Sequence, residues 1–346
     1  MTHIDVCGWD IGGAHLKAVS MDTVGRIVDA RQIACPLWRG TEHLGQAMQA
    51  ALNVASMHNT RHVVTMTGEL CDNFASRAEG VQEILDVIGR FLDPKQTRVY
   101  AGQHGWYGVD QVSSLGAENV GSANWRAMAE VVAISHENAM LIDVGSTTSD
   151  IVPILHGAPQ AFGSDDASRL SHDELVYSGV VRTPLMALCE HVPFAGSWQR
   201  VAAEHFATTA DIYRILGDLP EYADVHDTAD GALKTITASA RRVSRMLGRD
   251  LINDADAIRN AANYFAYCQF DLLQRALLAV QSRLGQRCEK IVAAGAGAFL
   301  VHKLARFNSI PCLNFSSLFD VAPTLEQAVM TCAPAAALAQ LGRKNS

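Results

Sequence analysis

The sequence is poor in basic residues: lysine and arginine number 28 against 36 aspartates and glutamates, and the formal net charge is −8. Nucleic-acid binders usually carry a basic surface, so this balance argues against a nucleic-acid partner. The sequence also lacks an apolar run long enough to span a membrane, and its first residues lack a basic region followed by an apolar core. We therefore expect no membrane partner and a cytoplasmic location.

Metal-ligand spacing is missing as well. None of the eight cysteines forms a C-x-x-C pair, and most lie in apolar surroundings. His58 and His62 are four residues apart, but no carboxylate motif of the zinc-protease type lies between them. This spacing argues against a zinc site and favours reduced, buried cysteines.

Apolar patterns predict an α/β protein with an internal repeat. A buried strand at 4–9, a glycine turn and a second strand at 16–21 open the chain. The segment 139–155, AMLIDVGSTTSDIVPIL, repeats this order of strand, aspartate, glycine turn and strand about 130 residues later. The repeat implies two structurally similar halves.

The predicted organisation is two α/β domains of related topology around a cleft, because 346 residues suit two domains or one large one. The first domain covers about 1–140. The second covers about 141–324 and contains a helical insertion at about 195–285. A C-terminal helix within 325–346 is a candidate to return to the first domain.

The first glycine loop is a candidate phosphate site. Asp10 ends the opening strand, Gly12 and Gly13 follow it, and Lys17 could add a cation. Glycines allow the close approach at which free backbone N–H groups cradle an anion. A plain strand-to-strand turn is the alternative.

Two later loops have the same character. In the second, Asp143 ends a strand and Asp150 follows a run of N–H and hydroxyl donors, which are Gly145, Ser146, Thr147 and Thr148. In the third, Gly295 and Gly297 precede a helix at 298–305, whose N-terminus favours negative charge. Each loop alone could be a turn, but their order and spacing together favour phosphate binding.

Magnesium is the expected cofactor. Asp10 and Asp143 are predicted to face each other across the cleft, where a hydrated Mg²⁺ could bridge them to phosphate groups. Whether ATP binds is left open by the sequence.

Six segments of the chain resemble a known group of proteins: DIGGAHLKA, TGELCDNFASRAEGV, DVGSTTSDI, DELVYSGVVRTPL, ASARRVSRMLGRD and AAGAGAFL. The three loops resemble the two phosphate motifs and the adenosine motif of the actin-like ATPase and sugar-kinase superfamily. Within it, GSTTSDI is similar to the second loop of the hydantoinase and oxoprolinase branch. More narrowly, the chain resembles proteins linked to one-carbon transfer through tetrahydromethanopterin and methanofuran.

The resemblance implies a transferase of methanofuran biosynthesis. Such an enzyme joins an aminomethyl-furanmethyl diphosphate to the phenol of γ-glutamyl-tyramine, or of tyrosine in a bacterial methylofuran, and releases pyrophosphate. The partners are then small molecules. The identity of the phenol is left open, as is the oligomeric state, a homo-oligomer being one alternative.

This chemistry needs a base, because a phenol with a pKa of about 10 is mostly protonated at neutral pH. Glu69 in TGEL is the first candidate, and a glutamate at a helix start is the alternative interpretation. Asp150 is the second candidate, although it could instead orient Thr148 or bind metal through water. Lys17 completes the predicted catalytic set as the cation of the first loop.

Arginines on a predicted helix are candidates for binding anions. Arg241 and Arg245 are four apart and Arg242 and Arg249 seven apart, so each pair shares a helix face. Arg242 is the candidate that would clamp diphosphate through forked hydrogen bonds. A solvated basic face is the alternative.

Other polar and aromatic residues are open to two interpretations. Arg182 in VVRTPL is a further candidate for an acidic substrate, and Tyr177 is as compatible with the core as with a site. His104, Trp106 and Tyr107 lie in a glycine-rich loop, where they could stack on a furan or phenol ring or cover a core edge.

Two other classes of function are compatible with the loops. One is an ATP-dependent kinase or a hydantoinase-like amidohydrolase, although the chain is shorter than a typical hydantoinase A subunit. The other is a non-catalytic, nucleotide-gated binding protein, because fold does not dictate function.

Overall fold

The computed structural model describes residues 3–52, 60–116, 119–225, 227–252 and 254–344. The chain divides into two compact units. Unit 1 comprises Met1–Leu141, Val152–Asp166 and Leu313–Ser346, and unit 2 comprises Ile142–Ile151 and Ala167–Cys312. These bounds differ from the predicted ones for residues 152–166 and 313–324, which unit 1 includes.

Unit 1 is built on a sheet of seven strands in the order β15-β3-β2-β1-β4-β5-β6. β1 is antiparallel to β2 and parallel to β4, so β1 and β4 end at the same edge of the sheet. The strands are β1 (Ile4–Ile11), β2 (His15–Asp22), β3 (Arg26–Ala34), β4 (Arg61–Met66), β5 (Thr97–Tyr100), β6 (Trp106–Gly108) and β15 (Asp320–Val321).

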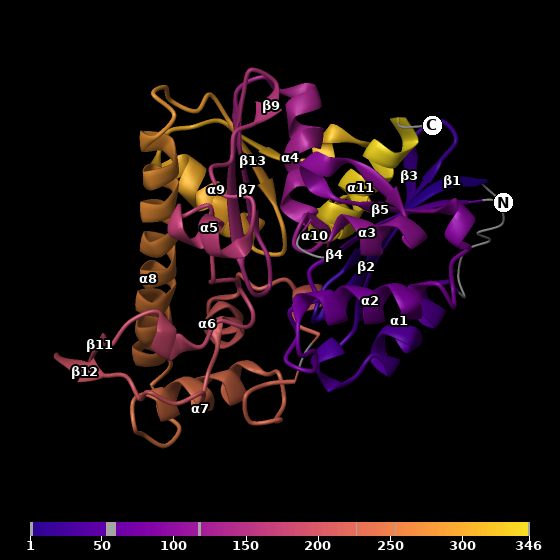
Figure 1. Ribbon diagram of the computed structural model, residues 1–346. Helices are drawn as coiled ribbons and strands as arrows, with labels where there is room; N and C mark the ends of the chain where they lie inside the picture. Colours follow the sequence, from indigo (N-terminus) through magenta and orange to yellow (C-terminus); the bar gives the residue numbers. More distant parts are fainter. Residues whose placement is uncertain (1–2, 53–59, 117–118, 226, 253, 345–346) are drawn as a thin grey trace. The chain divides into compact units, whose positions relative to one another are not determined.

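Helices cover both faces of this sheet. α11 (Ala333–Lys344) lies against β1 (Figure 1), and a Cβ added to Gly8 would stand 2.0 Å from the Ala335 carbonyl oxygen, so only glycine permits this approach. Successive side chains alternate between faces, and Trp9 therefore packs on the opposite side, in the core under α1 (Glu42–Leu52) and α2 (Arg77–Ile88). The remaining helices are α3 (Val112–Leu115), α4 (Asn124–Ser135) and α10 (Glu326–Thr331).

The second sheet has six strands, in which β10-β8-β7-β13-β14 are consecutive and β9 pairs with β8. Its strands are β7 (Ala139–Val144), β8 (Ser149–Leu155), β9 (Ala158–Pro159), β10 (Leu175–Val176), β13 (Ile291–Ala294) and β14 (Cys312–Asn314). β9 and parts of β7, β8 and β14 are assigned to unit 1, and the rest of this sheet to unit 2. A separate hairpin joins β11 (His191–Phe194) and β12 (Ser197–Arg200). The helices are α5 (Asp166–Ser171), α6 (Thr209–Leu216), α7 (Ile236–Met246), α8 (Ala255–Ser282) and α9 (Ala298–Phe307).

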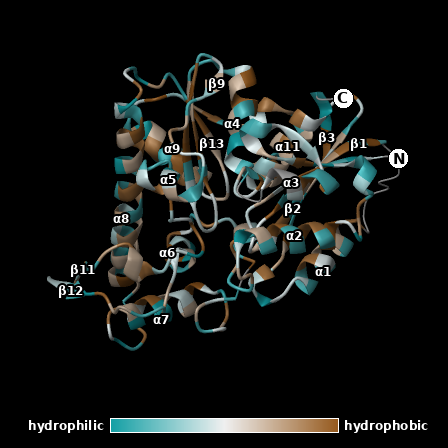
Figure 2. Ribbon diagram, viewed as in Figure 1, coloured by the Kyte–Doolittle hydropathy of each residue, from teal (hydrophilic) through white to brown (hydrophobic). Residues whose placement is uncertain are grey.

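The predicted α/β class is confirmed, and α6, α7 and α8 fall in the predicted helical insertion. In Figure 2, β13 is hydrophobic, whereas α8 alternates between hydrophobic and hydrophilic residues, as a helix with one buried face should.

No helix in the described ranges combines the length and apolar character needed to cross a membrane. His58 lies outside the described residues, and the buried His62 accepts a hydrogen bond from Trp9 Nε1 at 3.2 Å.

Candidate active site

The first loop lies directly against the segment that carries Glu69. The strand register pairs Ile11 with Met66, and the N–H groups of Thr67 and Gly68 both donate to the Ile11 carbonyl, at 2.9 and 3.0 Å. A Cβ added to Gly68 would stand 3.1 Å from the Gly12 carbonyl carbon. The glycines at 12 and 68 therefore allow the two loops to touch.

Asp10 and Lys17 form an ion pair between the two strands that flank the first loop. They are directly opposite each other on β1 and β2, and Lys17 Nζ lies 3.4 Å from Asp10 Oδ2. Asp10 is almost fully buried, while the Lys17 side chain is partly exposed. The cation of this loop is therefore held beside the aspartate predicted to bind metal.

Glu69 is fully buried at the end of this edge of the sheet. Its Oε1 accepts a hydrogen bond from Ser122 Oγ at 3.1 Å and lies 3.9 Å from Arg77 Nε. Its Oε2 is buried and accepts no hydrogen bond from another described residue. Burial raises the pKa of Glu69 from 4.5 to about 7, so this carboxyl group can take up and release a proton near neutral pH.

Glycines at two neighbouring positions leave the space that Glu69 occupies. A Cβ on Gly121 would stand 2.4 Å from Glu69 Oε1, and one on Gly80 would stand 2.3 Å from the Glu69 carbonyl oxygen. α2 begins only at Arg77, with Ser76 as its N-cap, so Glu69 does not start a helix. Both glycines are therefore part of what fixes this carboxylate.

Asp166 is a second carboxylate near Glu69 that sequence reasoning missed. Its Oδ2 lies 3.2 Å from Ser122 Oγ and 3.4 Å from Arg77 Nη2. Two carboxylates thus share one hydroxyl group and one guanidinium. Asp166 lies far from Glu69 in the sequence, and no local motif marks it.

The second loop is a tight turn clamped by a neighbouring segment. The Gly145 N–H donates to the Thr148 carbonyl at 2.9 Å, and the Arg182 N–H donates to the Ser146 carbonyl at 2.9 Å. A Cβ on Gly179 would stand 2.5 Å from the Ser146 carbonyl carbon. Ser146 and Thr147 stay partly exposed at the tip of the turn, so their hydroxyl groups can reach a ligand.

The third loop packs on the second. Gly295 has a φ of +83°, and Gly297 donates its N–H to the Val144 carbonyl at 2.8 Å. α9 begins directly after Gly297. The structure therefore brings together in unit 2 the turn at 145–148, Asp143 and the N-terminus of a helix, which is a favourable place for phosphate.

Asp150 is held in a buried ion pair. Arg169, only 1% exposed, donates from Nη1 to Asp150 Oδ1 at 2.7 Å and from Nη2 to the Glu174 carbonyl at 3.0 Å. This pair joins β8 to α5. The geometry favours a structural role for Asp150 over that of a base.

The structure argues against the predicted role of Arg242 in clamping the diphosphate. It is fully buried, and its guanidinium contacts Asp211 Oδ1 at 2.7 Å and Asp230 Oδ1 at 3.0 Å. Its donors are used inside unit 2, so we do not assign Arg242 to phosphate binding. The spacing of arginines on α7 could not reveal these aspartate partners.

No group of three or more histidine, cysteine, aspartate or glutamate side chains is arranged to hold a metal ion in the described part of the chain. Magnesium bound between a carboxylate and phosphate groups does not need such a cluster. The two predicted ligands are in different units, with Asp10 in unit 1 and Asp143 in unit 2.

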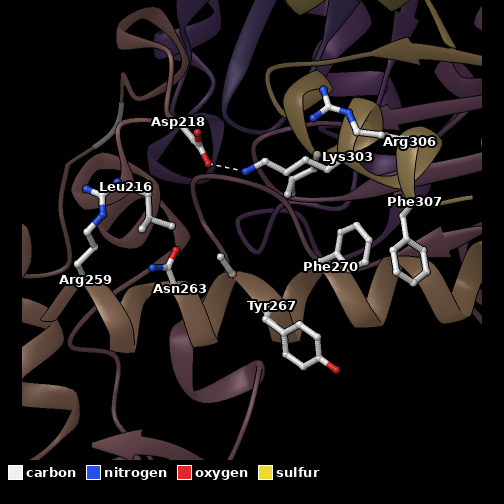
Figure 3. A pocket seen from close by; sticks show the side chains of 11 residues that line it. Leu216, Asp218, Arg259, Asn263, Tyr267, Phe270, Lys303, Arg306 and Phe307 are labelled. Carbon is white, nitrogen blue, oxygen red and sulfur yellow. Dashed lines mark hydrogen bonds and ion pairs between the residues drawn. The ribbon is translucent and has the colours of Figure 1, made fainter. Parts of the chain in front are cut away.

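A pocket of about 530 Å³ lies between α8 and α9 (Figure 3). Arg259, Lys303 and Arg306 line it together with aromatic rings, and Asp218 accepts from Lys303 at 2.6 Å. None of the sequence-predicted site residues lines this pocket.

Comparisons with known proteins give a family and a fold. The hydantoinase/oxoprolinase family profile matches residues 61–344. A Methanocaldococcus jannaschii protein named (4-{4-[2-(gamma-L-glutamylamino)ethyl]phenoxymethyl}furan-2-yl)methanamine synthase is 31% identical over 260 residues, which are 74% of this chain and 76% of that protein. A Methanococcus vannielii protein of the same name is 35% identical over 163 residues, which are 46% of this chain and 72% of that protein.

Among solved structures, nucleotide-free acetone carboxylase aligns with a TM-score of 0.56 at 12% identity, covering 97% of this chain and 70% of that chain. At this identity the likeness shows the fold alone. The chain therefore shares its α/β fold with that structure.

Proposed function

Because the chain belongs to the hydantoinase/oxoprolinase family, we propose that it is a transferase of methanofuran-type biosynthesis. It joins an aminomethyl-furanmethyl diphosphate to the phenolic oxygen of γ-glutamyl-tyramine or tyrosine and releases pyrophosphate. One observation carries the proposal: the synthase of Methanocaldococcus jannaschii, 31% identical over 260 residues, is named for a furan joined through a phenoxymethyl group.

The proposed step forms a bond from the phenolic oxygen to the furanmethyl carbon and breaks the bond from that carbon to the diphosphate oxygen. The phenol proton passes to a base, and pyrophosphate leaves with the bonding electron pair. Glu69 is the proposed base, because a group with a pKa of about 7 combines an ionised fraction with useful basicity at neutral pH. The unshared Oε2 is the atom that would receive the proton.

The second and third loops are the proposed diphosphate site. The turn at 145–148 offers backbone and hydroxyl donors, and the N-terminus of α9, a helix of ten residues, favours an anion. Donors fixed before the reaction stabilise the charge that develops on the leaving group. Lys17 is the proposed cation beside the first loop, where it already neutralises Asp10.

Magnesium is the proposed cofactor, and the donor set around Asp143 fits it. Carboxylate and hydroxyl oxygens are the hard ligands that Mg²⁺ prefers. Asp143, near the end of β7, and Ser146 and Thr147, in the turn that follows, supply them. Asp10 is the corresponding candidate in unit 1. When bound, the ion would neutralise negative charge on the departing diphosphate.

The test is a reaction with defined substrates. The purified protein is incubated with Mg²⁺, the aminomethyl-furanmethyl diphosphate, and either γ-glutamyl-tyramine or tyrosine. Mass spectrometry detects the aryl ether, and pyrophosphate is measured in parallel. We expect the ether and pyrophosphate in equal amounts with one of the two phenols.

A parallel reaction with the Methanocaldococcus jannaschii synthase controls for substrate quality. If that enzyme forms its ether while this protein forms neither ether nor pyrophosphate, the proposed reaction is wrong. Adding ATP to matched reactions then tests the alternative of an ATP-dependent kinase, because a kinase would consume ATP.

A further inference from the structure

Two side chains are exposed in a segment that is otherwise buried. From Leu175 to Thr183, each residue except Tyr177 and Arg182 is buried. Tyr177 is 69% exposed, which removes the interpretation that it belongs to the core. Within this segment, Tyr177 and Arg182 are therefore the two residues exposed to solvent.

These two residues lie on either side of the second loop. β10 pairs with β8 so that Val176 is opposite Ser149, and Tyr177 follows directly, beside the end of the turn. At the other side, the Arg182 N–H donates to the Ser146 carbonyl. Tyr177 and Arg182 thus bracket the turn at 145–148.

A buried polar network holds the segment in place. Gln269, fully buried on α8, donates from Nε2 to Ser178 Oγ and to the Gly179 carbonyl, each at 2.8 Å. Thr209 Oγ1 also donates to the Gly179 carbonyl, at 2.8 Å. Because these buried bonds fix the backbone, the two exposed side chains start from preorganised positions, which lowers the entropy lost on binding.

We infer that Tyr177 and Arg182 form a ring-and-anion subsite for an arylmethyl diphosphate, with Tyr177 stacking on the ring and Arg182 binding the diphosphate. The inference rests on the proposed function, since it assumes that the turn between them holds the phosphate groups. Tyrosine stacks on aromatic faces, and the arginine fork matches phosphate oxygens in pairs. Such a subsite contacts both ends of the substrate and binds it more tightly than a bare phosphate or an uncharged ring.

Direct binding tests the inference without turnover. Calorimetry in Mg²⁺ and without any phenol measures Kd for inorganic pyrophosphate and for the aminomethyl-furanmethyl diphosphate. For the wild type we expect tighter binding of the furan compound. Tyr177→Ala should remove this preference by weakening the affinity for the furan compound about 3- to 10-fold, and it should leave the affinity for pyrophosphate unchanged. Tyr177→Phe should retain the preference for the furan compound.

Arg182→Ala should lower the affinity for both ligands about 10-fold or more, and Arg182→Lys should restore part of the lost affinity. Met186→Ala, an exposed residue of the following turn, is the matched control and should change neither affinity.

The inference is overturned if Tyr177→Ala keeps the furan preference, or if Arg182→Ala binds pyrophosphate as the wild type does. Because ether formation is measured separately, an active wild type with unaffected variants leaves the proposed function standing. A wild type that binds neither ligand overturns both.

Discussion

Gly295 lies so close to Asp143 that a Cβ at position 295 would stand 2.2 Å from Asp143 Oδ1. The Gly295 φ of +83° adds strain for any residue with a side chain. Gly295→Ala should therefore displace the carboxylate proposed to bind magnesium. We expect kcat/KM for ether formation to fall at least about tenfold and the free energy of unfolding to drop by about 1–3 kcal/mol, measured in urea.

Gly285→Ala is the matched control. Gly285 also has a positive φ, of +66°, but no atom lies within 4 Å of its added Cβ. The Gly285→Ala variant should lose about 1–2 kcal/mol of unfolding free energy through backbone strain and keep its activity within about twofold of the wild type. Equal loss of activity in the two variants would contradict a special role for the contact with Asp143.

Glu69→Gln should remove the proposed base and keep the fold. Glutamine has the shape of glutamate, and its amide oxygen can accept the Ser122 hydrogen bond, but it cannot take up the phenol proton. We expect kcat to fall by about 10²- to 10⁴-fold while pyrophosphate affinity stays the same. Glu83→Gln, on the exposed side of α2, is the control and should leave kcat unchanged. A Glu69→Gln variant with more than a tenth of wild-type kcat would exclude Glu69 as the base.

The pH dependence of the reaction should follow the same carboxyl group. A base acts in its ionised form, and burial raises the pKa of Glu69 to about 7. We therefore expect kcat/KM to rise about tenfold per pH unit below about pH 7 and to level off above it. Rates measured from about pH 5.5 to 9 at constant ionic strength check this. A plateau that already begins near pH 5 would assign the titration to a carboxyl group with an ordinary pKa.

Stability should change with pH in the opposite direction. In the unfolded chain Glu69 ionises near 4.5, whereas in the folded chain burial holds the proton up to about 7. Between these pH values the folded state binds one more proton than the unfolded state. The stabilisation that Glu69 gives to the folded state is therefore complete below about pH 4.5 and is lost as the pH rises to about 7. The free energy of unfolding falls over this range by at most roughly 1.4 kcal/mol per pH unit. Because Glu69→Gln stays neutral, its unfolding free energy in urea should gain on that of the wild type from about pH 5 to 7. A constant difference would contradict the raised pKa.

The loops could be predicted from the sequence because their signals are local. An aspartate at the end of a buried strand followed by glycines marks Asp10 and Asp143, and each turn closes within a few residues of them. The parallel pairing of β1 and β4 brings the segment that carries Glu69 to the same edge of the sheet as the first loop.

The roles of individual charged residues could not be predicted in the same way. Arg242 is paired with Asp211 and Asp230, which precede it by 31 and 12 residues, and only the folded chain brings them together. The sequence shows that a charge is present, but whether it faces a ligand or a buried partner depends on tertiary packing. A helical arginine pattern alone is therefore weak evidence for an anion site.

Asp150 and Arg169 provide a test that separates structure from catalysis. Removing one member of a buried ion pair leaves the other charge uncompensated, so Arg169→Met and Asp150→Asn should each cost about 3–5 kcal/mol of unfolding free energy. The double variant should recover much of this loss, since neither charge is then left alone. Arg275→Ala, which breaks an exposed ion pair with Asp271 on α8, should cost less than about 1 kcal/mol.

Activity per folded molecule then decides the role of Asp150. If Asp150 acts only through its pair with Arg169, the double variant should bind pyrophosphate and form the ether at near wild-type rates once the folded fraction is taken into account. If the double variant folds but stays at least a hundredfold slower, the Asp150 carboxylate takes part in the reaction, and the structural role argued from its geometry is wrong.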